Sequence, residues 1–363
     1  MTDFAGDTIG LASAWILTCL LVLYTLETIW FTVRGFRARL EDRWSAFSAS
    51  LCMVGLVALF AWNGLTVFPN PFGPFLAVVG ILALVNAYTF TLGRYKEKIT
   101  RFTEQFGARM EPLLLELVPE ERLAAFRRMA QFEADPEARR KTPHLLMGLF
   151  LAFYLFLGYF LLKGLAAILP AGIATSNMQA VVAEGVLPAG HVFSMVMLLG
   201  LLLILAPMEM VRLRFPELSY PFKSVILSSL RKKEAGSFGA HYYIAIALGL
   251  AALTLTLDPL QWRTRVPLVL AMIAVTVFAD AASALVGKRW GQRKWFHNAD
   301  KSYLGSVAGF VVAVAVALPF VSLPVALACG VMFVFIDFIG PVPIPVSDNI
   351  LNPLGLGLLL YWL

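Results

Sequence analysis

Long apolar segments recur along the whole chain and are separated by mostly short polar loops. Most of these segments reach the length of about 20 residues that a helix needs to cross about 30 Å of hydrocarbon. The pattern therefore predicts a series of membrane-spanning helices, of which the last is short or re-entrant. The segments cover residues 10–33, 46–68, 73–93, 144–169, 190–211, 241–257, 266–287, 303–320, 323–340 and 350–363.

The composition supports this interpretation and excludes several classes of protein. Of the 363 residues, 59% are hydrophobic and 14% are charged, whereas a soluble domain is usually about half apolar and about a quarter charged. A soluble enzyme, a secreted disulfide scaffold, a coiled coil and a disordered chain are therefore excluded. Continuous apolar segments also exclude a β-barrel, whose strands alternate. We predict an all-α fold, a polytopic integral membrane helical bundle with about nine or ten membrane segments.

The basic residues indicate the orientation. Of the 29 lysines and arginines, 26 lie in the loops 34–45, 94–142, 212–240 and 288–302. If successive segments all span, these loops share one side, and the positive-inside rule makes that side cytoplasmic and places the N-terminus outside. The net charge of +6 then reflects topology and anionic lipid rather than nucleic acid, for which we expect no role. The excess of arginine over lysine favours a bacterial cytoplasmic membrane.

Three further features of the chain are a polar insert, a short mixed segment and the positions of the cysteines. The insert 94–142 has helical apolar spacing and predicts amphipathic helices on the cytoplasmic membrane surface, or a docking surface for a soluble partner. Residues 213–230 predict an interfacial or re-entrant segment. The cysteines lie in apolar segments without ligand spacing, so we interpret Cys19, Cys52 and Cys329 as small core residues.

Four acidic side chains lie inside the apolar segments, and ionisable residues in such positions are candidate functional sites in a membrane protein. They are Glu27, Glu209, Asp280 and Asp337. The last three lie close to the predicted cytoplasmic ends of their segments, and Asp337 is followed by a proline-rich turn. This arrangement predicts a site on the inner face of the membrane.

The densest group of such residues runs from Asp280 to Ser306. Asp280, Ser283 and Gly287 share one face of a helix, and glycines let a phosphate approach the backbone. Lys301-Ser302 opens the next segment, whose helix start favours an anion. A carboxylate, glycines, bases and a helix start together suit a nucleoside triphosphate with Mg²⁺. The alternative is a small-residue surface for helix packing, flanked by topology-setting bases.

Further short motifs lie on either side of this group, in a fixed order. They are Arg140-Lys141-x-x-His144 with Gly148; Glu209-x-x-Arg212; Arg231-Lys232-Lys233-Glu234 with Gly239 and Tyr242-Tyr243; Asp280, Ser283, Gly287 and Gly291 followed by Lys301, Ser302, Gly305 and Ser306; and Asp348-Asn349-x-x-x-Pro353. In this order they resemble the motifs of the CTP-dependent lipid-alcohol kinases, which include dolichol kinase, phytol kinase and CTP-dependent diacylglycerol kinase and are related to the phosphatidate cytidylyltransferases. Ala279, Leu351 and Asn352 depart from the family pattern.

The resemblance covers about residues 139–355. It implies CTP as phosphoryl donor, Mg²⁺ or another divalent cation as cofactor, and a lipid alcohol of the bilayer as acceptor. It also divides the chain into an accessory region, 1–138, with three spans and the cytoplasmic insert, and a lipid kinase-like membrane domain, 139–363. Self-association of the chain stays open.

The resemblance and the pattern together assign candidate roles. The candidate catalytic residues are Asp280, Asp337, Asp348 and His144, and the three aspartates are also the candidate metal ligands. The candidate nucleotide-binding residues are Arg140, Lys141, Arg231, Lys232, Ser283, Gly287, Lys288, Gly291, Lys301, Ser302, Gly305 and Asn349. Each has a structural alternative: helix–helix hydrogen bonding, exposure at a segment end, topology-setting charge, or helix capping. Trp290, Trp295 and His297 are expected to be interfacial anchors.

The leading hypothesis is transfer of the γ-phosphate of CTP to a polyprenol, dolichol, phytol or diacylglycerol at the cytoplasmic face. The runner-up is a cytidylyltransferase that makes CDP-lipid and pyrophosphate. A membrane transporter that uses its intramembrane carboxylates is a different class, although such sites usually lie near the midplane between inverted repeats. A non-catalytic membrane subunit is the remaining alternative.

Overall fold

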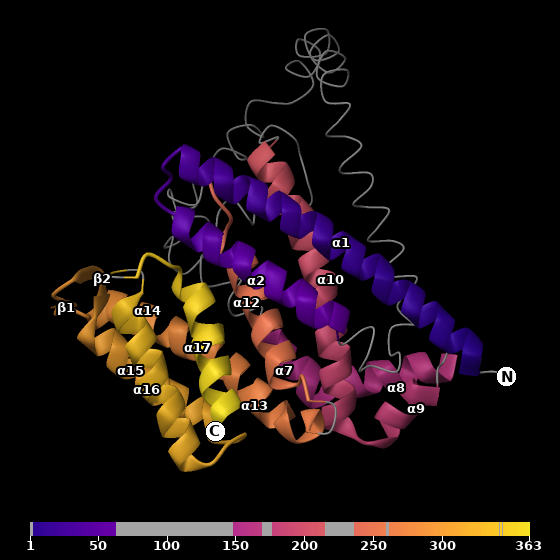
Figure 1. Cartoon of the computed structure of the whole chain (residues 1–363). Coiled ribbons are helices and arrows are strands. Elements are labelled where there is room, and N and C mark those ends of the chain that lie inside the picture. The colour runs from indigo at the N-terminus through magenta and orange to yellow at the C-terminus, as the bar shows by residue number, and fades with distance from the viewer. Residues whose placement is uncertain are drawn as a thin grey trace, which may run out of the picture.

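The computed structural model describes residues 3–62, 148–168, 176–214, 236–258, 261–340, 342 and 344–363. These residues form a bundle of helices and one short β-hairpin (Figure 1). The helices are α1 (Asp3–Arg37), α2 (Arg43–Trp62), α7 (Leu149–Ala152), η3 (Phe153–Leu157), α8 (Gly158–Ile168), α9 (Ser176–Ala183), α10 (Val186–Arg214), α12 (Ala240–Leu255), α13 (Trp262–Ala274), η5 (Val275–Ala279), α14 (Asp280–Trp290), α15 (Tyr303–Ala317), α16 (Leu323–Ile339) and α17 (Asp348–Trp362).

Every predicted apolar segment that the described residues cover is helical over most of its described length, with turn or irregular residues at some segment ends. Within these residues, five helices are long and apolar enough to cross a membrane, as expected for an integral membrane protein. They are Leu17–Arg37, Arg43–Trp62, Phe150–Ile168, Val186–Leu213 and Trp262–Trp290. Three more apolar helices are shorter, Ala240–Leu255, Tyr303–Ala317 and Leu323–Ile339. The predicted segment 73–93, the insert 94–142 and most of the predicted interfacial segment 213–230 lie outside the described residues.

The prediction of purely helical structure missed one element. After α14 the chain forms the antiparallel strands β1 (Lys294–Trp295) and β2 (Asn298–Ser302), paired as Lys294 with Ser302 and Trp295 with Asn298. The hairpin is held by aromatic packing, because the Trp295 ring lies 3.9 Å from the Tyr303 ring and 4.9 Å from the Phe338 ring. Figure 1 shows it beside α14, α15 and α16. This connection therefore carries Lys301 on an ordered strand.

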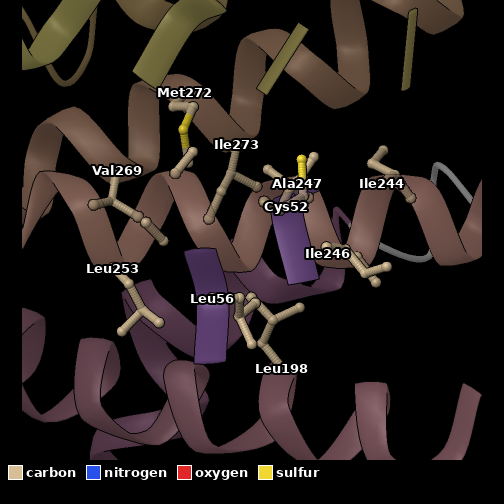
Figure 2. Close-up of a cluster of buried hydrophobic side chains, with 14 of the residues drawn as sticks. Cys52, Leu56, Leu198, Ile244, Ile246, Ala247, Leu253, Val269, Met272 and Ile273 are labelled. Atoms are coloured by element: carbon tan, nitrogen blue, oxygen red, sulfur yellow. The ribbon is translucent and has the colours of Figure 1, made fainter. Parts of the chain in front are cut away.

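The core is apolar and has α12 at its centre. This helix has buried residues on all sides, which is expected of a helix enclosed by other helices. Figure 2 shows Leu56 of α2, Leu198 of α10, Leu253 of α12 and Met272 of α13 converging in one cluster. Cys52 and Cys329 are buried, as predicted, whereas Cys19 is exposed on α1, so its assignment to the core is wrong.

The two N-terminal helices share this core. Leu21 of α1 and Leu56 of α2 belong to the same buried cluster as α10 and α12. A polar contact reinforces the packing, since Thr28 Oγ1 lies 3.0 Å from the Tyr242 hydroxyl. The described part of the N-terminal region is thus packed against the region that carries the sequence motifs.

Candidate functional site

A cluster of charged side chains is centred on Lys301, at the end of strand β2. Its ammonium Nζ donates to Asp337 Oδ1 at 2.6 Å and to Asp348 Oδ2 at 3.0 Å. Asp337 is on α16 and Asp348 opens α17, so the ion pairs join three elements that are distant in sequence. The Lys301 side chain is 16% exposed, whereas those of Asp337 and Asp348 are 2% and 9% exposed. All three side chains are thus largely buried.

Asp337 has further donors besides Lys301. Ser306 Oγ of α15 donates to Asp337 Oδ2 at 2.5 Å, and Ser283 Oγ of α14 donates to the same atom at 3.3 Å. Trp295 Nε1 in turn donates to Ser306 Oγ at 3.1 Å. A buried carboxylate is stable only when it is paired and hydrogen-bonded, and Asp337 meets both conditions. Asp337 therefore joins α14, α15, α16 and the hairpin.

Asp280 contributes to the electric field at Lys301. It begins α14, is buried, and lies one helical turn before Ser283 on the same face. Burial alone lowers the pKa of the Lys301 ammonium, but the negative charges of Asp348, Asp337 and Asp280 outweigh it and raise this pKa above its ordinary value. Lys301 is therefore a fixed positive charge surrounded by three aspartates.

The glycines of the motif allow α14 and α15 to approach each other closely. A Cβ atom on Gly305 would lie 2.7 Å from the Ser283 carbonyl oxygen and 3.0 Å from Gly287 Cα, and a Cβ on Gly291 would overlap the Ser302 hydroxyl. The protein itself thus fills the space beside these glycines. This arrangement favours the helix-packing alternative for Gly287, Gly291 and Gly305 over direct contact with a phosphate.

Both predicted helix starts are present and capped by serine. Ser302 precedes α15, and its Oγ accepts from the Gly305 amide at 3.1 Å. Ser347 precedes α17, and its Oγ accepts from the Asn349 amide at 3.3 Å and from Asn349 Nδ2 at 3.2 Å. Serine at this position satisfies backbone donors that a helix start leaves open. Asn349 therefore has a local capping contact, as the structural alternative expects.

A second buried polar cluster lies at the end of α10. Arg212 forms two bonds with Glu209, Nε to Oε1 at 3.1 Å and Nη2 to Oε2 at 2.7 Å. Glu209 also accepts from the Gly239 amide at 2.8 Å, and its Oε1 lies 3.0 Å from His241 Nε2. Arg212 additionally donates to the Ser237 carbonyl. These contacts fix the end of α10 against the start of α12.

The turn between α1 and α2 connects the two clusters. Asp42 Oδ2 accepts from the Tyr243 hydroxyl at 2.7 Å and from Ser237 Oγ at 3.3 Å. Ser45 Oγ accepts from the backbone amide of Ser347 at 3.0 Å. The α1–α2 turn, the end of α10, the start of α12 and the start of α17 thus meet at one end of the bundle. The distribution of basic residues predicts that the loops at this end lie on the cytoplasmic side of the membrane.

The structure brings some of the predicted site residues together and says nothing of others. The residues that meet around Lys301 are Asp280, Ser283, Asp337 and Asp348. Ser302, Gly287, Gly291 and Gly305 form the adjacent helix contact, and Lys288 is exposed. The predicted residues Arg140, Lys141, His144, Arg231 and Lys232 lie outside the described residues.

Sequence reasoning gave no role to several residues of these clusters. Ser306 was part of the motif but was not assigned, and its place four residues after Ser302 puts it on the same helix face. Trp295 and His297 were expected only to anchor at the interface. Trp295 instead binds Ser306, and His297 Nε2 lies 2.6 Å from the Phe338 carbonyl. Nothing in the sequence pattern indicates Asp42, because its partners Ser237 and Tyr243 lie 195 and 201 residues away.

The described residues do not form a ready site for a divalent cation. Among them, no three acidic, histidine or cysteine side chains converge as a metal-ligand group. The cation between Asp337 and Asp348 is the Lys301 ammonium, which occupies the carboxylate oxygens that Mg²⁺ would need. The predicted metal-ligand role of Asp280, Asp337 and Asp348 does not fit this arrangement. Mg²⁺ stays an implication of the resemblance, and no step below depends on it.

Comparisons with family models, with curated proteins and with solved structures found no match to this chain.

Proposed function

We propose that this protein is an integral membrane enzyme that transfers the γ-phosphate of CTP to a lipid alcohol at the cytoplasmic face. The observation that carries the proposal is the convergence on Lys301 of three aspartates from separate helices, Asp280, Asp337 and Asp348. Lys301 supplies a positive charge of fixed position beside the capped start of α15, and a lysine ammonium and a helix start are both groups that bind phosphate.

Each residue of the Lys301 cluster has a role in the proposed phosphoryl transfer. Lys301 offers positive charge to the phosphates, and Asp337 and Asp348 hold its ammonium in place. The alcohol oxygen attacks the γ-phosphorus, the bond from that phosphorus to the bridging oxygen breaks, and CDP leaves. The hydroxyl proton needs an acceptor, and we assign it to Asp280, a buried carboxylate at the start of α14 whose charge acts on Lys301.

The position of the cluster agrees with this chemistry. A lipid hydroxyl lies at the membrane surface, while CTP comes from the aqueous side, so the reaction needs a site at the end of the spanning helices. The Lys301 cluster lies beside the start of α15 and α17 and next to the arginine- and lysine-rich connection after α14. In the topology that the basic loops predict, this end faces the cytoplasm.

Label transfer from CTP tests the proposal. Purified protein is incubated with Mg²⁺, CTP labelled at the γ-phosphate and a panel of polyprenol, dolichol, phytol and diacylglycerol, and the lipid fraction is analysed. We expect the γ-label in one lipid. A cytidine label in the lipid would indicate the cytidylyltransferase instead, and the absence of label from every alcohol would overturn the proposal.

Two substitutions connect such activity to the site. Lys301→Met and Asp280→Asn should each lower kcat by about 100-fold or more, since each removes charge from the reacting centre. The control is Arg263→Gln, because Arg263 forms an exposed ion pair with Glu184 at 2.5 Å outside the cluster. Equal loss in all three variants would indicate a general effect on folding and would contradict the assignment.

A further inference from the structure

We infer that the α1–α2 turn positions the Lys301 cluster, and that Ser45 is the positioning residue. The catalytic part of this inference rests on the proposed function, whereas the structural part does not. Ser45 lies at the start of α2, is 2% exposed, and belongs to a region that no sequence motif covers.

The contact is a single hydrogen bond to the backbone in front of α17. The Ser347 amide donates to Ser45 Oγ at 3.0 Å. Ser347 is the N-cap residue of α17, and its own hydroxyl accepts from Asn349. Asp348 stands between them and binds Lys301 at 3.0 Å. Ser45 therefore holds the residue immediately before the carboxylate that holds Lys301.

The turn that precedes Ser45 and α2 is itself fixed. Asp42 lies three residues earlier, is 6% exposed, and accepts from Tyr243 at 2.7 Å and from Ser237 at 3.3 Å. These bonds attach the turn to α12 and to the segment before it. The turn is thus bound to the core through Tyr243 and Ser237. Because the start of α2 follows this turn directly, Ser45 is held in place and in turn holds the backbone next to Asp348.

Loss of the Ser45 hydroxyl would leave the Ser347 amide without this acceptor. The start of α17 would then open more often, and Asp348 would hold Lys301 less firmly. We expect kcat to fall about tenfold, which corresponds to about 1.4 kcal/mol of lost transition-state stabilisation, because a displaced Asp348 leaves the Lys301 ammonium out of place when charge develops on the phosphate. The KM for the alcohol should change less than about twofold, because the walls that bind an apolar tail are untouched.

The experiment compares Ser45→Ala with Ser50→Ala. Ser50 is a matched control, because it is also buried on α2, and its hydroxyl contacts the Ala46 carbonyl at 3.0 Å and Thr32 at 2.8 Å rather than α17. Hydrogen exchange of the amides at 346–350 is measured on the full chain, together with kcat and KM. Ser45→Ala should speed this exchange about tenfold, Ser50→Ala should leave it unchanged, and Ser45→Thr should restore it.

Each result has a separate meaning. Equal exchange at 346–350 in Ser45→Ala and Ser50→Ala would overturn the inference. Faster exchange in Ser45→Ala with full kcat would overturn the positioning role in catalysis. Faster exchange with no label transfer in the unmodified protein would refute the proposed function and leave the structural link standing. If Ser45→Ala does not fold, Ser45→Cys keeps a weaker acceptor at this position and should give an intermediate exchange rate.

Discussion

Lys301 shows how a buried cation can be kept charged by its neighbours. Removal from water disfavours an ammonium, but two direct ion pairs and the field of Asp280 more than offset this, so that the pKa rises. The same contacts make the three aspartates depend on one amine. A single substitution therefore leaves several carboxylates without their counter-charge, which is costly in a largely buried site.

The direction of this pKa shift predicts how the stability lost in Lys301→Met depends on pH. A group whose pKa is higher in the folded state stabilises the protein fully below its unfolded pKa, about 10.5 for Lys301, and loses this contribution as the pH rises further. Lys301→Met should therefore lower the melting temperature by the same amount at every pH from 7 to about 9. Thermal unfolding in detergent measures it. A difference that shrinks between pH 7 and 9 would contradict the raised pKa.

The sequence predicted part of this site. The spacing of Asp280 and Ser283 gave their common helix face, and the hydropathy pattern gave Asp337 as an ionisable residue inside an apolar segment. The bonds from Lys301 to Asp337 and Asp348 could not be predicted, because they span 36 and 47 residues of sequence and depend on how β2, α16 and α17 meet. Lys301 was accordingly assigned to phosphate alone.

At the level of elements, the crossing of α14 and α15 fixes the distance between Asp280 and the start of α15. The crossing is close because Gly287 and Gly305 face each other without side chains. Ser302 fills the remaining space and also caps α15. The small residues of the motif thus place the charged ones, even where no ligand touches them.

A second prediction tests this crossing. Gly305→Ala should destabilise the protein by about 1–3 kcal/mol, because the added methyl group on α15 would lie 2.7 Å from the Ser283 carbonyl oxygen of α14. Gly164→Ala is the control, since a Cβ atom there meets nothing within 4 Å and alanine favours a helix. Thermal unfolding of both variants in the same detergent checks it. If Gly305→Ala were as stable as Gly164→Ala, the close approach of α14 and α15 would be wrong.

The elements themselves were predictable to different degrees. The long helices follow from apolar length alone, and their residues are helical wherever the structure describes them. The hairpin was missed because strands of two and five residues carry no useful periodicity and are held by Trp295, Tyr303 and Phe338. The π-helical segments η3 and η5 were also missed, since their hydrogen-bond register depends on packing.

For the whole molecule, the main feature is that polar contacts collect where several helices end. The α1–α2 turn contacts α12 and the start of α17, and the Glu209 and Lys301 clusters lie on either side of it. The alternate basic loops predict that such ends share the cytoplasmic side, and this topology stays a prediction. The contacts themselves join residues up to 302 positions apart, and no local pattern predicts such pairs.

A third prediction concerns the side on which this end lies. In a variant without the native cysteines, single cysteines replace the exposed residues Ala38, Lys294 and Thr264. An impermeant thiol reagent should label Thr264→Cys in intact cells, and Ala38→Cys and Lys294→Cys only after permeabilisation, because the positive-inside rule places the basic loops in the cytoplasm. The reverse pattern would invert the topology and move the proposed site away from cytoplasmic CTP.

The enclosure of α12 has a consequence for how the protein responds to its bilayer. Its 16 residues extend only about 24 Å, less than the usual hydrocarbon thickness of about 30 Å. A lipid-facing helix of this length would suffer hydrophobic mismatch and would tilt or thin the membrane around it. Because α2, α10, α13 and α17 surround α12, its length is matched to protein neighbours rather than to acyl chains. Any adjustment to thicker or thinner membranes must therefore occur in the peripheral helices.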